Sequence, residues 1–387
     1  MAWPYSKQPF DHTIETFFIL LSVYSIYSYA ICESIRYLLI AGASIGFAFI
    51  TRQTSLLAMP SLFVLMVVCR GKISNLRANI GQIARDTIFF LMAFLPFLFL
   101  SFWYNYYRFG SIFETGYQLM ADRMGIDYFK STSLLKGISG LLISPGKGFF
   151  YYSPVALLFF FAIKAFIKRY TGLGASFVLF ILSYLLFFSK YVYWHGDWAW
   201  GPRYIFAITP FLMIPVAEFF ESVSTSSKKA KRLAVALIFI LSVTIQIGAV
   251  SVDFQKYFLD LKFVAKISST LREGKGVQII QELPSSIYYD WKRSPIISQF
   301  VFIYEIAGEI KDYRYKELSE NAAIHEPMET YPSMHVFDFW WVYLYYYFGN
   351  YYGFIIAIML LLIAIFYGSR LWKYSRHNNS YFKEQEA

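Results

Sequence analysis

Charged residues are scarce in this chain. Asp, Glu, Lys and Arg make up 16% of its 387 residues, whereas an average soluble domain contains about 25%. Hydrophobic residues make up 57%, aromatic residues make up 21%, and the mean hydropathy is +0.44. This composition excludes an ordinary soluble domain and predicts an integral membrane protein.

Several other signals are also missing. The chain has only two cysteines, Cys32 and Cys69, each within or at the end of an apolar run, so we expect no disulfide framework. No carboxylate pair or histidine cluster has the spacing of metal ligands, and we predict no metal or other cofactor in this chain. The apolar runs are continuous rather than alternating, which favours helices over membrane strands.

What the chain does contain is a series of nine apolar runs of helical length. They lie at about residues 13–31, 37–50, 55–68, 87–104, 154–167, 173–188, 204–220, 233–250 and 339–367. These runs predict an all-α integral membrane protein, a bundle of about nine transmembrane helices with external loops and a small external insertion towards the C-terminus. The predicted division is a core of eight spans over 1–250, an external soluble segment over 251–338, and a last span with a basic tail over 339–387.

Basic residues cluster beside alternate connections between these runs, for example at 70–85 and 228–232. Cytoplasmic loops carry an excess of Lys and Arg, so we predict an external N-terminus and a cytoplasmic C-terminal tail, with the cell membrane as the location. The net charge of +10 is then explained by anionic membrane lipids, and we expect no nucleic-acid partner. Every chemically suggestive loop falls on the external side in this topology.

The most suggestive stretch is residues 194–204, which we call the Trp-rich loop. Within eleven residues it holds three tryptophans, a histidine, an aspartate and an arginine, hinged by two glycines and a proline. Amphipathic rings favour the membrane–water boundary, and ionisable groups kept at that depth cost free energy, so they indicate a functional site. The alternative is an aromatic belt with a structural pair between Asp197 and Arg203.

Five motifs in order along the chain resemble a known family. They are Trp3-Pro4-Tyr5-Ser6-Lys7, residues 46–52 ending in Arg52, residues 105–110, Ser144-Pro145-Gly146-Lys147-Gly148, and the Trp-rich loop. Together they resemble polytopic membrane glycosyltransferases of the GT-C type, of the protein-mannosyltransferase and aminoarabinose-transferase kind. The resemblance implies a bundle of transmembrane helices with a lipid-facing cavity, and a sugar on a polyprenyl phosphate as donor. Some members of the family use a divalent metal.

The resemblance also implies a missing part. In that family the catalytic carboxylate lies in the first external loop, ahead of the segment comparable to Trp3. We therefore expect this chain to be the C-terminal part of such an enzyme, with an N-terminal half as partner, or else an inactive relative. The acceptor is expected to be a protein, lipid or glycan.

Transfer from a lipid phosphate needs cations that hold the phosphate as negative charge develops on it. The candidates are Arg203, Arg52, Lys147 and Lys7. Arginine suits this role because its planar fork matches phosphate oxygens. The alternatives are an Arg203–Asp197 salt bridge, a capping role for Arg52 at a broken helix, and an ordinary turn at Lys147, whose surroundings do not match a P-loop.

The other candidate residues fall into two groups. Asp197 and His195 are the predicted catalytic pair, with Asp197 as a base or as a group that orients Arg203, and His195 as a phosphate contact or proton relay. The wall for sugar and acceptor is expected to consist of Trp194, Trp198, Trp200, Tyr204, Glu114 and Tyr117. For Glu114 and Tyr117 a loop hydrogen-bond network is the alternative. Glu15, at the start of the first run, is expected to balance Lys7 or Arg52.

Two other functions remain open. A flippase or transporter for a lipid-linked sugar would also place cations near a lipid cavity, although transporters often show repeats and mid-span charges, and here the charges lie at span ends. A non-catalytic partner subunit is the other alternative.

Overall fold

The computed structural model of the chain describes residues 2–7, 10–68, 76–130, 132–196, 199–224, 228–260, 285–309 and 336–385. Throughout these ranges the regular elements are helices, and no strand occurs among them. Six helices in these ranges are long and apolar enough to cross a membrane. The prediction of an all-α membrane protein is confirmed at this level.

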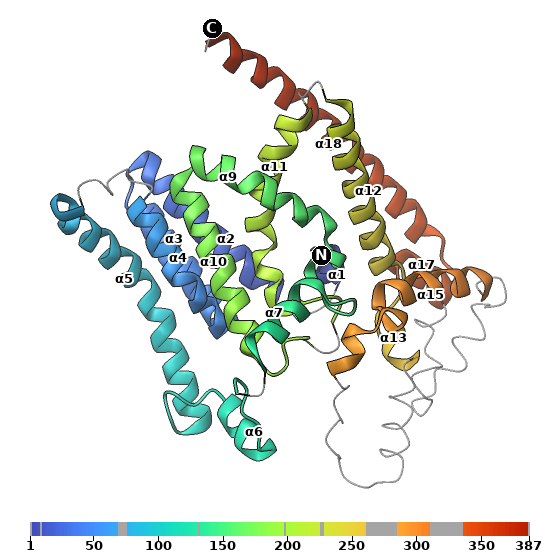
Figure 1. The fold of residues 1–387 in the computed structure, drawn as a ribbon, viewed down its shortest axis with the longest axis horizontal. Helices are drawn as coiled ribbons and strands as arrows, with labels where there is room; N and C mark the ends of the chain where they lie inside the picture. Colours follow the sequence, from blue (N-terminus) through green and yellow to red (C-terminus); the bar gives the residue numbers. More distant parts are fainter. Residues whose placement is uncertain are drawn as a thin grey trace. The chain divides into compact units, whose positions relative to one another are not determined.

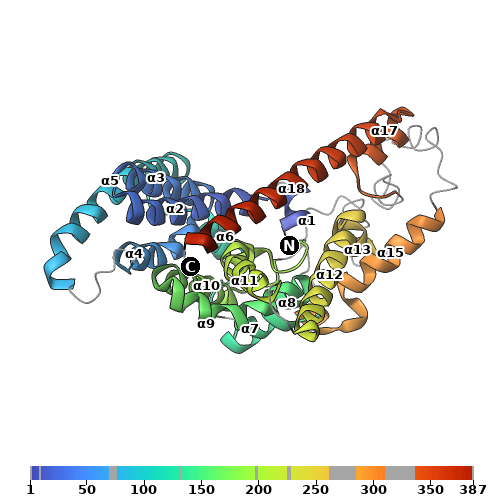
Figure 2. The same ribbon diagram turned by 90° about the horizontal axis from the view of Figure 1, so that it is seen from above.

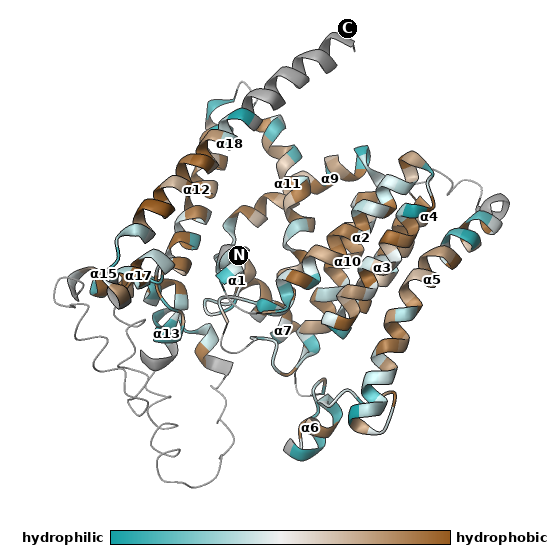
Figure 3. Cartoon of the chain, turned by 180° about the vertical axis from the view of Figure 1, so that it is seen from behind, coloured by the Kyte–Doolittle hydropathy of each residue, from teal (hydrophilic) through white to brown (hydrophobic). Residues whose placement is uncertain are grey.

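The six candidate spans correspond to six of the apolar runs. They are α2 (His12–Cys32), residues Ile80–Phe109 of α5 (Leu76–Phe109), α10 (Thr171–Lys190), η4 (Arg203–Ile208) with α11 (Thr209–Ser224), α12 (Lys229–Ser251), and residues Tyr352–Arg370 of α18 (Tyr352–Gln385). Their apolar faces are coloured brown in Figure 3. Many of these side chains are exposed, for example Leu361 at 60% and Phe99 at 62%, as expected of helices that face lipid.

The other three runs form shorter elements. They are α3 (Arg36–Thr51), η1 (Gln53–Ala58) with α4 (Met59–Val68), and η3 (Pro154–Leu158) with α9 (Phe159–Arg169). The 16 residues of α3 extend about 24 Å at 1.5 Å per residue, less than the roughly 30 Å of a bilayer core. The predicted count of nine spans and the external insertion are therefore not confirmed.

The last run is also divided. Gly349 has a φ of +62°, a left-handed conformation that ends α17 (Trp340–Phe348) before α18 begins. Cys32 is an exposed free thiol, and Cys69 lies outside the described residues.

The chain divides into two compact units. The first comprises Met1–Ala249 with Gln281–Ser298, and the second comprises Val250–Ile280 with Gln299–Ala387. In the second unit, the side chain of Gln299 on α15 (Pro295–Glu309) donates to the backbone oxygen of Val252 at 2.7 Å. Lys256 on α13 (Gln255–Asp260) lies 3.8 Å from Glu305 of α15.

Helices α2, α3 and α5 of the first unit lie side by side, with α3 in contact with both of the others (Figures 1 and 2). The side chain of Ser22 on α2 donates to the backbone oxygen of Ala41 on α3 at 3.0 Å. Gly42 and Gly46 of α3 face α5, and a Cβ added at Gly42 would clash with the carbonyl oxygen of Phe90. Only glycine permits this approach of the two helices.

Short helices complete the first unit. They are α6 (Tyr117–Met124), α7 (Leu134–Ile143), α8 (Phe149–Tyr152), η5 (Ser285–Tyr289) and η6 (Trp291–Arg293). Three of them, α7, α8 and η5, contact the Trp-rich loop. Ser294 donates to the backbone oxygen of Pro145, and the backbone nitrogen of Gly146 donates to that of Tyr288, both at 2.9 Å. Residues 285–294 therefore pack against the turn that contains Lys147.

The contact between α3 and α5 gives a first prediction. Gly42→Ala forces a methyl group into the backbone of α5, and overpacking of this kind costs about 1–3 kcal/mol. Gly81→Ala on α5 is the matched control, because no other element among the described residues comes within 4 Å of the added Cβ and alanine favours the helix. We expect a lower midpoint of thermal unfolding in detergent for Gly42→Ala and an unchanged or higher one for Gly81→Ala. Equal midpoints would contradict this packing.

Candidate functional site

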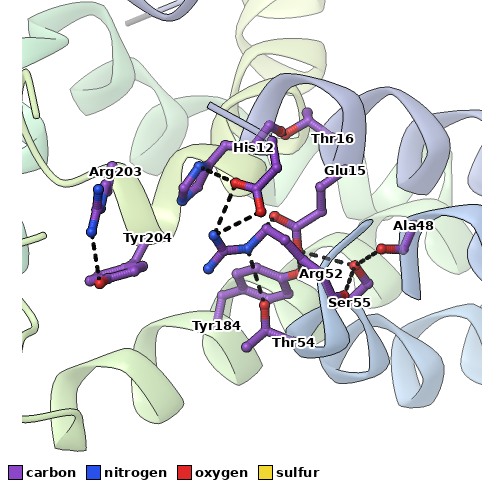
Figure 4. Close-up of polar contacts among 11 residues, drawn as sticks. His12, Glu15, Thr16, Ala48, Arg52, Thr54, Ser55, Tyr184, Arg203 and Tyr204 are labelled. Carbon is purple, nitrogen blue, oxygen red and sulfur yellow. Dashed lines mark hydrogen bonds and ion pairs between the residues drawn. The ribbon is translucent and has the colours of Figure 1, made fainter. Parts of the chain in front are cut away.

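A buried ion-pair cluster lies at the N-terminal end of α2. Arg52 Nε lies 3.2 Å from Glu15 Oε2, and Arg52 Nη1 lies 3.1 Å from Asp11 Oδ1. The side chain of Glu15 is 1% exposed and that of Arg52 is 16% exposed. Of the two partners proposed for Glu15 from the sequence, the structure places Arg52 beside it. Figure 4 shows Glu15 and Arg52 side by side.

The local backbone explains how Arg52 reaches this cluster. Helix α3 ends at Thr51, and Arg52 takes an extended conformation (φ −147°, ψ 120°) before η1 begins. This break directs the Arg52 side chain towards the start of α2. Ser55 of η1 closes the break, because its hydroxyl lies 2.9 and 2.7 Å from the backbone oxygens of Ala48 and Arg52 and shares its single proton among the acceptors around it. Capping of a broken helix and ion pairing therefore both occur at this position.

Glu15 is held from a third helix as well. Tyr184 of α10 donates its hydroxyl to Glu15 Oε1 at 2.7 Å, and the Ser55 hydroxyl lies 3.2 Å from the same oxygen. Both carboxylate oxygens are therefore engaged. The cluster joins α2, the α3–η1 break and α10 in one polar network inside an apolar bundle.

Arg203 lies next to this cluster, at the start of η4. Its guanidinium carbon is 4.9 Å from the centre of the Tyr204 ring, and that of Arg52 is 5.8 Å from the centre of the same ring. Arg203 Nη2 also donates to the Tyr204 hydroxyl at 3.1 Å. Two of the four predicted phosphate cations thus meet at one aromatic ring from the predicted sugar wall. Cations over aromatic faces are favoured by the ring quadrupole.

Gly196 determines how Arg203 reaches this ring. It has a φ of +68°, and an added Cβ would lie 2.8 Å from Arg203 Cγ. Both the turn and the close contact therefore require glycine. Within the part of the chain that the structure describes, no carboxylate pairs with Arg203, and its buried Nε has no hydrogen-bond partner. The charge of Arg203 is less balanced there than that of Arg52.

Lys147 lies elsewhere in the same unit. Its side chain is 1% exposed, and Nζ donates to the backbone oxygen of Ala199 at 2.6 Å. Tyr5, on α1 (Ala2–Lys7), donates its hydroxyl to the backbone oxygen of Trp200 at 2.9 Å and stacks on Phe206 of η4. Burial raises the pKa of Tyr5, so this hydroxyl remains a donor. Lys147 thus supports the backbone of the Trp-rich loop, while Tyr5 connects that loop to η4.

The remaining predicted residues lie around this centre. His195 is 4% exposed and stacks on Tyr288 with ring centres 4.6 Å apart, and Trp194 packs over Gly140. Glu114 accepts from the backbone nitrogen of Gly116 at 2.8 Å, a loop contact. Tyr117 is 63% exposed. Lys7 is exposed on α1, and Trp200 is buried against Tyr152. Asp197 and Trp198 lie outside the described residues.

Sequence reasoning did not single out Asp11, His12 or Tyr184. The available signal was the stretch Asp11-His12-Thr13-Ile14-Glu15, which places three ionisable residues where the first apolar run begins. No feature of the sequence pointed to Tyr184, because a single tyrosine within an apolar run is common. Among the residues described here, no three His, Cys, Asp or Glu side chains gather as around a metal ion.

Comparison of the chain with protein-family models, with curated proteins and with solved structures gives no match. The argument for function therefore depends on the residues of the site itself.

The buried ion pair gives a second prediction. Removing one partner of a buried pair costs about 3–5 kcal/mol, because the other charge is left unpaired. We expect Arg52→Leu and Glu15→Leu each to lower the unfolding midpoint strongly, and the double variant to lose less than the sum of the two. Arg169→Leu is the control, since its pair with Glu218 is exposed and contributes at most about 1 kcal/mol. Additive losses would show that Arg52 and Glu15 do not act as a pair.

Asp11 gives a third prediction, on pH. Burial alone would raise the pKa of its carboxyl, but contact with His12 and the positive charge of Arg52 outweigh burial and lower the pKa from 3.8 to about 2. A lowered pKa stabilises the folded state above the unfolded-state value, and that stability is lost as the pH falls. The midpoint difference between the wild type and Asp11→Asn should be constant above pH 5 and shrink between about pH 4 and pH 2. A difference independent of pH would contradict this.

Proposed function

We propose that this chain is a membrane glycosyltransferase, or the C-terminal part of one, that moves a sugar from a polyprenyl-phosphate donor to a protein, lipid or glycan acceptor. The observation that carries the proposal is the meeting of Arg52 and Arg203 at the Tyr204 ring, 5.8 and 4.9 Å from its centre. A cationic group next to an apolar helix bundle fits a lipid phosphate, whose head is charged and whose chain is apolar.

Arg203 is the better phosphate ligand of the two. Arg52 already faces Asp11 and Glu15, so its charge is balanced within the protein. The guanidinium of Arg203 has no carboxylate beside it among the described residues, and its buried Nε is available as a donor. When the bond between sugar and phosphate breaks, negative charge grows on the departing phosphate, and a fixed guanidinium stabilises it.

An apolar groove supports the lipid part of the proposal. Its volume is about 410 Å³, and it lies between α2, α10 and α11. Its lining along α2 begins at Phe17, two residues after Glu15, and continues to Tyr27. Phe177 and Ile214 line it from the other two helices. Ten residues of helix span about 15 Å, so the groove accommodates a stretch of isoprenoid chain whose phosphate lies at the cluster.

The carboxylates of the cluster fit an orienting role. Glu15 contacts Arg52, Ser55 and Tyr184 and its side chain is 1% exposed, so it is held as a structural partner of Arg52 and is poorly placed to meet an acceptor. In the proposed enzyme the base is Asp197 or a carboxylate upstream of this chain. In this proposal the site lies on the non-cytoplasmic side, the chain crosses the membrane nine times, and residues 251–338 form an external segment.

Arg203 provides the fourth prediction, measured as binding. Arg203→Ala removes a charge-assisted contact worth about 1.5–3 kcal/mol, so the dissociation constant for polyprenyl phosphate in detergent should rise about tenfold to a hundredfold. Arg203→Lys keeps the positive charge but loses the planar guanidinium, so its dissociation constant should lie between those of the wild type and Arg203→Ala. Arg169→Ala, at an exposed pair on α9, serves as the control and should bind normally. Equal affinity for wild type and Arg203→Ala would refute the phosphate assignment.

Transfer itself is tested with a labelled polyprenyl-phosphate sugar and the purified chain, alone and with any N-terminal half. The proposal expects release of polyprenyl phosphate that depends on Arg203. Movement of the intact lipid-linked sugar across a vesicle, with no release, would instead establish the flippase alternative.

A further inference from the structure

His12 is buried with one ring nitrogen unpaired, which is unusual for an imidazole. Its side chain is 2% exposed, Nδ1 faces the Asp11 carboxylate, and Nε2 has no hydrogen-bond partner among the described residues. Polar groups buried in proteins nearly always have such a partner, and an exception points to a ligand or a chemical role. His12 is the first residue of α2 and lies beside Asp11 of the ion-pair cluster.

Asp11 determines which nitrogen of His12 carries the proton. Asp11 Oδ1 lies 3.0 Å from Nδ1, close enough to attract a proton on that nitrogen. The same oxygen accepts from Arg52 Nη1 at 3.1 Å. Because Arg52 already balances the carboxylate, the neutral ring with its proton on Nδ1 is favoured. Nε2 then carries a lone pair and accepts a hydrogen bond.

His12 and Arg203 share their aromatic neighbours. The His12 ring centre lies 5.9 Å from that of Phe10 and 6.2 Å from that of Tyr204. The Arg203 guanidinium lies 5.3 Å from the centre of Phe10 and 4.9 Å from that of Tyr204. Figure 4 shows the His12 ring between the side chains of Arg203 and Arg52. A phosphate held by Arg203 therefore has Nε2 as a near neighbour.

The groups around Nε2 limit what it binds. The ionisable neighbours are Asp11 and Glu15 on the α2 side, Arg52 from the α3–η1 break, Arg203 and Tyr204 from η4, and Tyr5 from α1. A lone pair repels phosphate oxygens, and two guanidinium groups exclude a cation. A neutral donor remains, and a hydroxyl group fits best.

We propose that His12 Nε2 accepts a hydrogen bond from a hydroxyl of the donor's sugar, next to the phosphate held by Arg203. This assignment rests on the proposed function and adds a sugar-reading residue to it, with Asp11 as the residue that positions the ring. His12 thereby distinguishes the sugar-bearing lipid from the bare lipid phosphate that is left after transfer.

The test compares two ligands by binding, without turnover. The probes are undecaprenyl phosphate and its mannosyl, glucosyl and 4-amino-4-deoxyarabinosyl esters, measured against the full chain in detergent. His12→Phe keeps a ring but loses the acceptor. It should weaken the best-bound sugar ester about tenfold, the value of one lost hydrogen bond, and leave undecaprenyl phosphate within about twofold. His12→Gln keeps an acceptor near Nε2 and should restore most of the affinity for the ester.

The controls separate this inference from the proposed function. Tyr29→Phe removes a 2.7 Å hydrogen bond to Asp86 at the other end of α2 and should change neither affinity. If His12→Phe weakens both ligands equally, or neither, His12 does not read the sugar, and the inference is overturned while the phosphate site stands. If the wild type binds no polyprenyl phosphate and Arg203→Ala changes nothing, the proposed function and the inference fail together.

Discussion

The ion pair between Arg52 and Glu15 is the interaction on which the rest of the site depends. A guanidinium and a carboxylate this deeply buried are costly to desolvate, and the cost is offset only when geometry and further hydrogen bonds are good. Both conditions hold, because Tyr184 and Ser55 donate towards the same carboxylate that faces Arg52. The pair therefore fixes the α3–η1 break against the start of α2 and the end of α10. Asp11, His12 and Tyr204 are positioned by this arrangement.

Helix α2 carries different chemistry along its length. Its first turn holds the ion-pair cluster, its middle lines the apolar groove, and Tyr29 in its last turn donates to the buried Asp86 of α5 at 2.7 Å. An amphiphile with a charged head and an apolar chain matches this order from the N-terminal end onwards. The second polar contact, at the far end, joins α2 to α5.

The sequence predicted the fold class well and the details of the site only in part. Composition and continuous apolar runs suffice to indicate membrane helices, because a helix surrounded by lipid must carry apolar side chains over the thickness of the bilayer. The ordered motifs also brought Arg52, Arg203 and Tyr204 into one hypothesis, and these three residues do lie together. The number of transmembrane spans was harder to predict, because α3 and η1–α4 are short helices on either side of a polar break. The contacts of His12 and Tyr184 depend on the packing of distant helices, which no local pattern encodes.

The central claim is that a lipid phosphate binds where Arg52 and Arg203 meet the Tyr204 ring. Photo-crosslinking with a polyprenyl phosphate that carries a diazirine on its first isoprene unit tests this most directly, with the labelled residues identified by mass spectrometry. The account predicts labels within residues 10–17 and 203–206, at the start of α2 and in η4, which competing unlabelled lipid phosphate removes. Labels concentrated around Tyr29 and Asp86, or spread evenly over the lipid-facing helices, would contradict it.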